Sequence, residues 1–448
     1  MTRKRVAAYG MLFFLLLAIV GLSSRPAAAQ SQPAPSQQQE QKPAYTIAEY
    51  NAFQAARGEK DPQARLRLLD DFVVKFPAST LMQYIDRLYI ETYGQQKNYP
   101  KVIEYADKLQ AMGDKLPVED RINFAYTRSA TFQAIFNPKD ANVKEELDSA
   151  RQAADLGLKL LNDWKKPATL TDDQYTQQKK LAATTFNSTG GFVALQQKDY
   201  KAAVNYFTAS LAITPNDALT YYRLGLAYLL QEPAKSMEGF WSLARAIALK
   251  APGEAQVRDY LRKRMLAYQQ PGCDHLIDSQ MNELIQLATS SPDRPASYSI
   301  PSADDLNKVR SSSNIVTVLT DLKGGGDKSK MTWLAVCGSE FPEVVGKVIE
   351  VTPGSDDVLM KVYTGATSEE MESATTANMD VKIAGQSEAS RLQKDDGVRF
   401  SGTLAGYDPE PFMLHWEKCK VNPEDIPADK AAPGAHRAKR PIKKPGVR

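Results

Sequence analysis

Histidine and cysteine are scarce in this chain, which has three of each among its 448 residues. His436 lies in a polar C-terminal stretch, and His415 lies on a predicted strand with no partnering Ser or Asp motif. Cys273 and His275 supply at most two metal ligands, and no Cys-x-x-C motif is present. Catalysis needs acids, bases or nucleophiles that converge. The sequence therefore predicts no catalytic residues, no metal site and no cofactor.

Phosphate-binding motifs are also missing. The stretch 323–329 reads Lys-Gly-Gly-Gly-Asp-Lys-Ser, and Asp327 stands where a phosphate loop requires glycine. A carboxylate at that point would repel phosphate. We expect instead a flexible hairpin turn between two strands.

Long apolar runs are absent except at the N-terminus. Basic residues at 3–5 precede an apolar run from about Val6 to Leu22, and Ala27-Ala28-Ala29 then offers a cleavage site. This pattern predicts a secretory signal peptide over 1–29, so the chain is expected to be exported, as a periplasmic or secreted protein of a bacterial envelope. An uncleaved N-terminal membrane anchor is the alternative. Residues 30–43 are rich in Gln, Pro and Ser, which predicts a disordered leader.

Positive charge is confined to the two ends. The whole chain has a formal charge of +3, and its last twenty residues, 429–448, hold seven cations and one Asp. Without the signal peptide and this tail, the remaining chain has a charge of about −7, which argues against nucleic acid as a partner. We expect 429–448 to be a disordered basic tail, which either contacts a membrane surface or cell-wall polymer or only solubilises the chain.

An exported chain folds in an oxidising space, where a disulfide is allowed. Because three cysteines cannot all pair, at least one is left over. Cys337 and Cys419 fall in the same expected domain, so we predict that they form the disulfide and leave Cys273 outside it.

A spacing of 34 residues separates Gly191 from Gly225, and both lie in one sparse pattern of small and aromatic residues. Small residues allow two helices to approach closely, an aromatic ring fills the groove between them, and a proline ends the helix. The pattern consists of Gly191, Tyr200, Ala203, Phe207 and Pro215 in one copy and Tyr221, Leu224, Gly225 and Tyr228 in the next.

This pattern resembles the tetratricopeptide family, whose repeat has the same length. The resemblance implies an α-solenoid of helical hairpins over 44–270, with weaker hairpins at 46–76, 80–112 and 117–163 and a terminal cap at 257–268. It also implies a concave face that binds a protein or peptide. Helical geometry places Ser188, Tyr222 and Leu229 on that face, although Tyr222 and Leu229 could instead pack between hairpins. A generic helical bundle is the alternative fold.

The hydrophobic period changes after a helix and a Pro-rich linker at 271–301. A short helix at 302–311 is expected to lead into a β-rich domain that extends to 428. Its expected strands are 315–319, 332–337, 344–351, 358–363, 379–383, 398–404 and 412–421. A helical pattern at Ala389 and Leu392 separates the last two strands from the three before them.

The last five strands and that helix follow the order of an OB-fold, a small five-stranded barrel. The segment 343–422 resembles exported OB-like domains related to the tRNA-anticodon-binding type. Such domains bind oligonucleotides or oligosaccharides, and His415, Trp416 and Lys418 are candidates for a small platform if Trp416 is not in the core. A β-sandwich and an SH3-like barrel are alternative folds.

The predicted architecture is thus multi-domain, with an α-solenoid followed by a small, mainly β barrel. The favoured function is an exported scaffold that binds an envelope protein or peptide and has no catalysis of its own. The alternative is a module that binds envelope polymer or carbohydrate through the barrel. The oligomeric state is not predicted.

Overall fold

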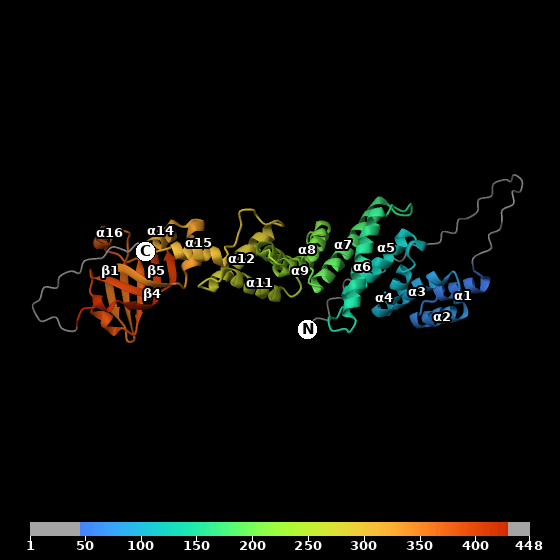
Figure 1. The fold of residues 1–448 in the computed structure, drawn as a ribbon, viewed down its shortest axis with the longest axis horizontal. Coiled ribbons are helices and arrows are strands. Elements are labelled where there is room, and N and C mark those ends of the chain that lie inside the picture. Colours follow the sequence, from blue (N-terminus) through green and yellow to red (C-terminus); the bar gives the residue numbers. More distant parts are fainter. Residues whose placement is uncertain (1–44, 429–448) are drawn as a thin grey trace, which may run out of the picture. The chain divides into compact units, whose positions relative to one another are not determined.

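The computed structural model describes residues 45–428, so the signal peptide, leader and basic tail that we predict lie outside the described residues. The chain divides into two compact units at Ser242 and Leu243 (Figure 1). Helical hairpins form the first unit. Helices followed by a closed five-stranded barrel form the second. The predicted fold class, helical repeats and then a small β barrel, is confirmed.

The first unit consists of helices that pack in sequence order, each against the next. Their bounds are α1 (Ile47–Gly58), α2 (Pro62–Lys75), α3 (Met82–Gln95), α4 (Tyr99–Gln110), α5 (Val118–Ile135), α6 (Val143–Asp163), α7 (Asp172–Gln196), α8 (Tyr200–Ile213), α9 (Ala218–Leu230) and α10 (Ser236–Ala248), which runs into the second unit.

Local sequence explains where these helices begin and turn. The hydroxyls of Thr46 and Thr171 accept hydrogen bonds from backbone N–H groups three residues later, in capping boxes that start α1 and α7. Lys97, Lys198 and Lys250 follow the ends of α3, α7 and α10, with φ of 58°, 62° and 59°. Each is followed by a residue whose N–H donates to a carbonyl five positions back. The same left-handed stop therefore recurs without glycine.

The hairpin of α7 and α8 is the most closely packed part of the repeat pattern. A Cβ added at Gly191 would lie 2.5 Å from the Phe207 ring, and Ala203 and Phe207 have no exposed surface. Leu224 is buried in the same cluster, and Tyr221 and Tyr228 pack against it half-buried. The glycine thus brings α7 against the ring that fills the groove.

The second unit begins with more helices. After α10 come α11 (Glu254–Gln269), α12 (His275–Ser290), α13 (Ala303–Ser312), α14 (Ile315–Gly324) and α15 (Gly326–Val336). The strands that we predict at 315–319 and 332–337 are wrong, because both segments are helical. Asn314 and Thr317 form a capping box, and the buried residues of α14 recur at helical spacing. The glycine-rich stretch joins two helices, with Gly325 and Gly326 at φ of 67° and 70°.

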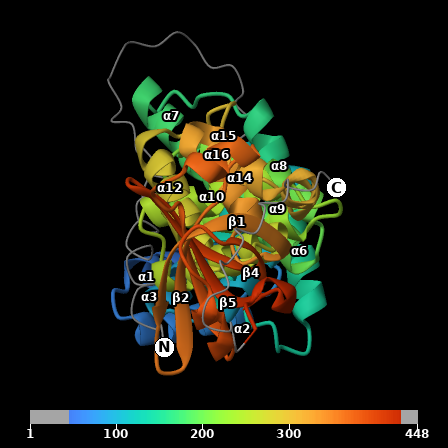
Figure 2. The same ribbon diagram turned by 90° about the vertical axis from the view of Figure 1, so that its left-hand side faces the viewer.

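The five remaining predicted strands form the barrel. They are β1 (Glu340–Pro353), β2 (Asp357–Tyr363), β3 (Met379–Ala384), β4 (Gly397–Pro409) and β5 (Phe412–Val421). Their order around the barrel is β1-β2-β3-β5-β4, closed by the β1–β4 pair (Figure 2). The β3–β5 pair is parallel and the others are antiparallel. A short helix α16 (Ser368–Ser373) lies between β2 and β3, and a 3-10 helix (Ser387–Arg391) precedes β4.

The barrel shares one hydrophobic core with α13, α14 and α15. Trp416 is 1% exposed, with its ring edge-on to Phe341 and Phe400. Trp333 of α15 contacts Tyr407 of β4 at a ring-centroid distance of 4.9 Å. These helices are therefore an integral part of the barrel domain.

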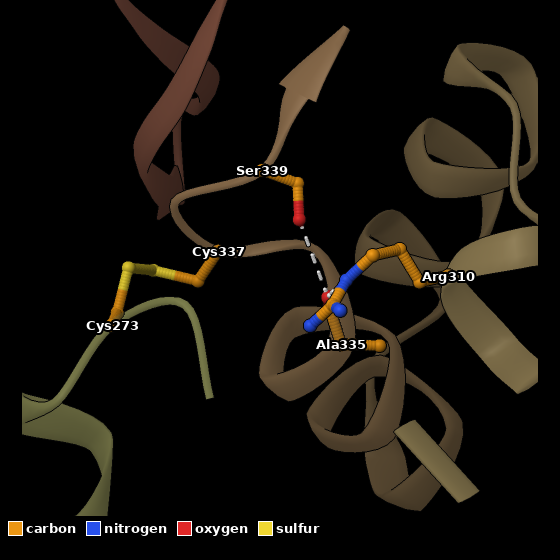
Figure 3. The surroundings of a disulfide bond; sticks show 5 residues. All are labelled: Cys273, Arg310, Ala335, Cys337 and Ser339. Atoms are coloured by element: carbon orange, nitrogen blue, oxygen red, sulfur yellow. Dashed lines mark hydrogen bonds between the residues drawn. A yellow bond between two sulfur atoms is a disulfide. The ribbon is translucent and has the colours of Figure 1, made fainter. Parts of the chain in front are cut away.

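The predicted Cys337–Cys419 disulfide is wrong. The bond joins Cys273 to Cys337, with Cα atoms 5.6 Å apart (Figure 3). Cys419 is a free, fully buried thiol in the barrel core, and burial raises its pKa to about 12. Cys337 follows the last residue of α15, outside that core, where it meets the turn between α11 and α12.

Candidate functional site

The first helices of the five hairpins, α1, α3, α5, α7 and α9, contact one another through their side chains. We call the surface formed by these contacts the A face. Phe53 of α1 lies 6.1 Å from the Tyr84 ring of α3. The contacts continue from α3 to α5, from α5 to α7 and from α7 to α9. One continuous row of side chains therefore links helices that are separated in sequence by the second helices of the hairpins.

The N-terminal half of the A face is aromatic and its charges are paired. Arg87 of α3 makes two hydrogen bonds to the Asp120 carboxylate, at 2.6 and 3.1 Å. The same guanidinium lies over the Tyr84 and Phe124 rings, at 5.4 and 5.5 Å from their centroids. Since Arg87 already has a carboxylate partner, this half offers apolar surface rather than free charge.

The C-terminal half of the A face is built around the amide of Gln133, at the end of α5. Its Nε2 donates to Thr189 Oγ1 at 2.8 Å and, more weakly, to Ser188 Oγ at 3.4 Å, both on α7. Its Oε1 accepts a hydrogen bond from Arg223 Nη1 of α9 at 3.0 Å. One side chain therefore ties three helices together and orients Arg223.

Arg223 is half-buried, with its guanidinium 4.7 Å from the centroid of the Phe192 ring. Burial lowers its pKa to about 10, so the group is still a cation at neutral pH. Within residues 45–428, no carboxylate lies within ion-pair distance of it. Asp217 attracts the guanidinium from beyond that distance, but the effect of burial on the pKa is the larger one. Arg223 is therefore poised to gain from an anionic partner.

The second helices carry an arginine with similar surroundings but a different electrostatic state. Arg151 of α6 lies 4.8 Å from the centroid of the Tyr206 ring of α8. It also pairs with Asp155 at 3.3 Å, and Asp155 accepts a hydrogen bond from the Tyr206 hydroxyl. Arg151 thus has the same cation–π contact as Arg223 but is neutralised within the protein.

The residues predicted for the binding face are only partly brought together. Ser188 and Tyr222 are half-buried on α7 and α9, close in sequence to the Arg223 cluster. Leu229 is 3% exposed and packs directly against Gly239, where an added Cβ would lie 2.5 Å from the Leu229 side chain. Leu229 therefore belongs to the hairpin core. Sequence reasoning missed Gln133 and Arg223. Arg223 directly follows Tyr222, but its lack of a carboxylate partner is a property of the folded chain.

The barrel does not form the predicted platform, because Trp416 is in its core. His415 lies on the barrel surface between two carboxylates, 2.9 Å from Asp408 and 3.5 Å from Asp380. Residues 340–428 hold seventeen acidic and eight basic side chains, a net charge of −9. A surface of that sign repels a phosphate backbone.

Residues 45–428 contain no group of three or more His, Cys, Asp or Glu side chains that could hold a metal ion. In the same range, no helix has the length and apolar character that a membrane span requires.

Comparison with solved structures yields a few likenesses. No protein-family model matches the chain, and no curated protein matches it. A solved structure described as "MamA RS-1 ArsTM double mutant" is similar at 19% sequence identity and a TM-score of 0.30. The match covers 47% of this chain and 96% of that one. A likeness at that TM-score establishes neither a family nor a function.

Proposed function

We propose that this chain is an exported scaffold of the tetratricopeptide type, which binds an envelope protein through its A face and catalyses no reaction. The observation that carries the proposal is Arg223, a half-buried cation with no carboxylate at ion-pair distance in the described part of the chain; Asp217 acts on it only from farther away. The ligand that fits is an extended polypeptide segment with a carboxylate, which would pair with Arg223.

The surroundings of Arg223 support this assignment. Gln133 holds the guanidinium by one hydrogen bond, and Phe192 supports its face, so little side-chain entropy remains to be lost on binding. Tyr222 and the aromatic N-terminal half of the A face offer apolar contacts for the rest of the segment. Charge would fix the register of the ligand, and apolar contact would add affinity.

Two features support export. The sequence pattern of 1–29 is that of a signal peptide, and the Cys273–Cys337 disulfide is a bond that persists in oxidising compartments. A cytoplasmic chain would be expected to hold this pair as thiols. Mass spectrometry of the mature protein purified from its source would test both points, through its N-terminal residue and the state of the cysteines.

The binding proposal is tested by comparing Arg223→Gln with Arg151→Gln in the full chain. Immobilised wild-type protein is first screened against a library of peptides that contain Asp and Glu. Each peptide that binds is then made again with Asn in place of Asp and Gln in place of Glu. A hydrogen bond between charged groups contributes about 1.5–3 kcal/mol, so Arg223→Gln should weaken the acidic peptides by about 10-fold or more. Arg151→Gln, which removes an arginine with the same kind of ring contact, should leave binding unchanged.

Two results would contradict the proposal. One is an equal loss in both variants, which would show a general effect on folding. The other is a set of hits that bind equally well with Asn and Gln, which would remove the role of the cation.

A polymer-binding barrel remains a second candidate because of its strand order. The closed order β1-β2-β3-β5-β4, with β3 and β5 parallel, supports assignment to the OB class, whose members include oligosaccharide-binding modules. Its acidic surface favours neutral or cationic glycans over anionic polymers. Titration of the full chain with cell-wall glycan fragments would test this function. Leu359 is exposed on β2, so Leu359→Asp should weaken glycan binding if the barrel is the site. Unchanged binding by this variant would argue against the barrel.

A further inference from the structure

The Cys273–Cys337 disulfide joins the α11–α12 turn of the second unit to the end of α15. Cys273 lies in the turn between α11 and α12, and Cys337 directly follows α15. The hydrophobic core shared by α13, α14, α15 and the barrel contains no residue of α11 or α12 and does not contain Cys337. The bond therefore ties the barrel domain to helices outside its core, which also touch it where α11 contacts α13. Breaking the bond removes no side chain from the barrel core.

On the barrel side, the chain around Cys337 is firmly held. Gly338 N–H donates to Leu404 O of β4 at 2.8 Å, and Leu404 N–H donates to Ser339 O at 3.1 Å. The Arg310 side chain of α13 donates to Ala335 O at 2.8 Å (Figure 3). The residues next to Cys337 are thus hydrogen-bonded to both β4 and α13.

On the other side, the backbone of the turn that carries Cys273 lies directly against this chain. A Cβ at Gly272 would lie 2.1 Å from Cys337 O, and a Cβ at Gly338 would lie 2.5 Å from Gly272 O. Gly338 also has a φ of 73°, which favours glycine. The two glycines that flank the disulfide allow the two backbones to touch. The disulfide is the covalent link at this point.

We propose that the Cys273–Cys337 disulfide is a redox lock. When closed, it fixes the α11–α12 hairpin to the barrel domain. When opened, it frees the joint, and both parts stay folded. The joint would then move about the segment 291–302, which connects α12 to α13.

The chemistry of opening is thiol–disulfide exchange with a dithiol. A thiolate of the dithiol attacks the Sγ of half-buried Cys273, forming a mixed disulfide, and the S–S bond breaks with its electron pair on Cys337, which takes up a proton. The second thiol of the dithiol then attacks the mixed disulfide and releases Cys273 as a thiol. Two electrons pass to the protein, and the dithiol becomes a disulfide. Cys337 itself is fully buried, so Cys273 is the sulfur open to attack.

The test uses the full chain in three forms: oxidised wild type, wild type treated with dithiothreitol, and Cys273→Ser. Limited proteolysis measures cleavage between 291 and 302, and a maleimide reagent measures the reactivity of Cys419. With the lock open, we expect cleavage in this segment to be at least about tenfold faster, because the rate follows the population of the open joint. Cys419 should stay unreactive, since the barrel core is intact. Cys419→Ser, which keeps the lock, should cleave like oxidised wild type.

Two results would overturn the proposal. Unchanged cleavage in both opened forms would mean that non-covalent contacts hold the joint. Rapid labelling of Cys419 after opening would mean that the bond is needed for the barrel fold, and the disulfide would then be a folding staple and not a lock.

Discussion

Replacing Gly191 by alanine tests the packing of the helical repeats most directly. Gly191 lies in the interior of α7, where a glycine destabilises a helix by about 1 kcal/mol relative to alanine. From helix propensity alone, the substitution should stabilise the protein. The close contact of Gly191 with α8 predicts instead that the substitution destabilises it.

The magnitude follows from the surroundings of the added methyl group. Its carbon would lie 2.5, 2.6 and 2.9 Å from three atoms of the Phe207 ring, far inside normal contact distance. Phe207 is fully buried among Ala194, Ala203 and Leu224, so its ring has no free space to enter. Overpacking of this kind costs about 1–3 kcal/mol. After the gain in propensity, Gly191→Ala should destabilise the α7–α8 hairpin by up to about 2 kcal/mol.

Gly94 is the matched control. It lies within α3, and a Cβ there would meet nothing within 4 Å. Gly94→Ala should therefore stabilise its helix by a few tenths of a kcal/mol, up to about 1. Hydrogen exchange of peptides from α7, α8 and α3 measures each effect locally, which suits a chain of more than one unit. We expect Gly191→Ala to speed hydrogen exchange in α7 and α8. We expect Gly94→Ala to leave exchange in α3 unchanged or to slow it.

A double-mutant cycle tests the assigned cause. If the Phe207 ring is the obstacle, Phe207→Leu should make room for the alanine methyl, and the two substitutions should couple by at least about 0.5 kcal/mol. Two results would refute the close-packing argument. One is that the effects of Gly191→Ala and Phe207→Leu are additive. The other is that Gly191→Ala stabilises α7 as much as Gly94→Ala stabilises α3.

Three further predictions concern other parts of the fold. Asp120→Ala leaves Arg87 largely buried without its carboxylate, so it should destabilise the α3–α5 contact by about 3–5 kcal/mol, measured by urea unfolding. Cys337→Ser opens a loop with a sequence separation of 64, for which loop entropy alone gives a loss of about 4 kcal/mol. Because the freed joint also gives the folded variant more freedom, we expect a smaller loss between oxidised wild type and variant, measured in the same way. Burial raises the pKa of Tyr105 and Tyr206 to about 12, above the value of about 10 for an unfolded tyrosine. Their contribution to the free energy of unfolding should therefore be complete below pH 10 and disappear as the pH rises to about 12. The phenolate absorbance and the midpoint of unfolding, measured over this pH range, should change together.

The repeat architecture could be predicted because its signal is local. Gly191, Ala203 and Phe207 have a spacing that only a helical hairpin satisfies at every position, and the structure has that hairpin. The barrel strands β2, β3 and β4 likewise alternate between buried and more exposed positions. In both cases, the period along the chain reports which side chains share a face.

Other features depend on contacts that the sequence does not display. Ile315, Val316 and Val318 are β-branched and favour a strand, but the Asn314 cap and packing against the barrel core favour a helix. The correct partner of Cys337 depends on which way α15 runs. The unpaired charge of Arg223 is visible only when every neighbouring side chain is in place.

Site-specific photo-crosslinking in the native cell tests whether the A face binds the partner. A photoreactive residue at position 222 lies on α9 beside Arg223, and one at position 201 lies exposed on α8, a second helix. We predict a discrete protein adduct from position 222 that disappears with Arg223→Gln, and no such adduct from position 201. An adduct from 201 alone, or one from 222 that survives Arg223→Gln unchanged, would contradict the account.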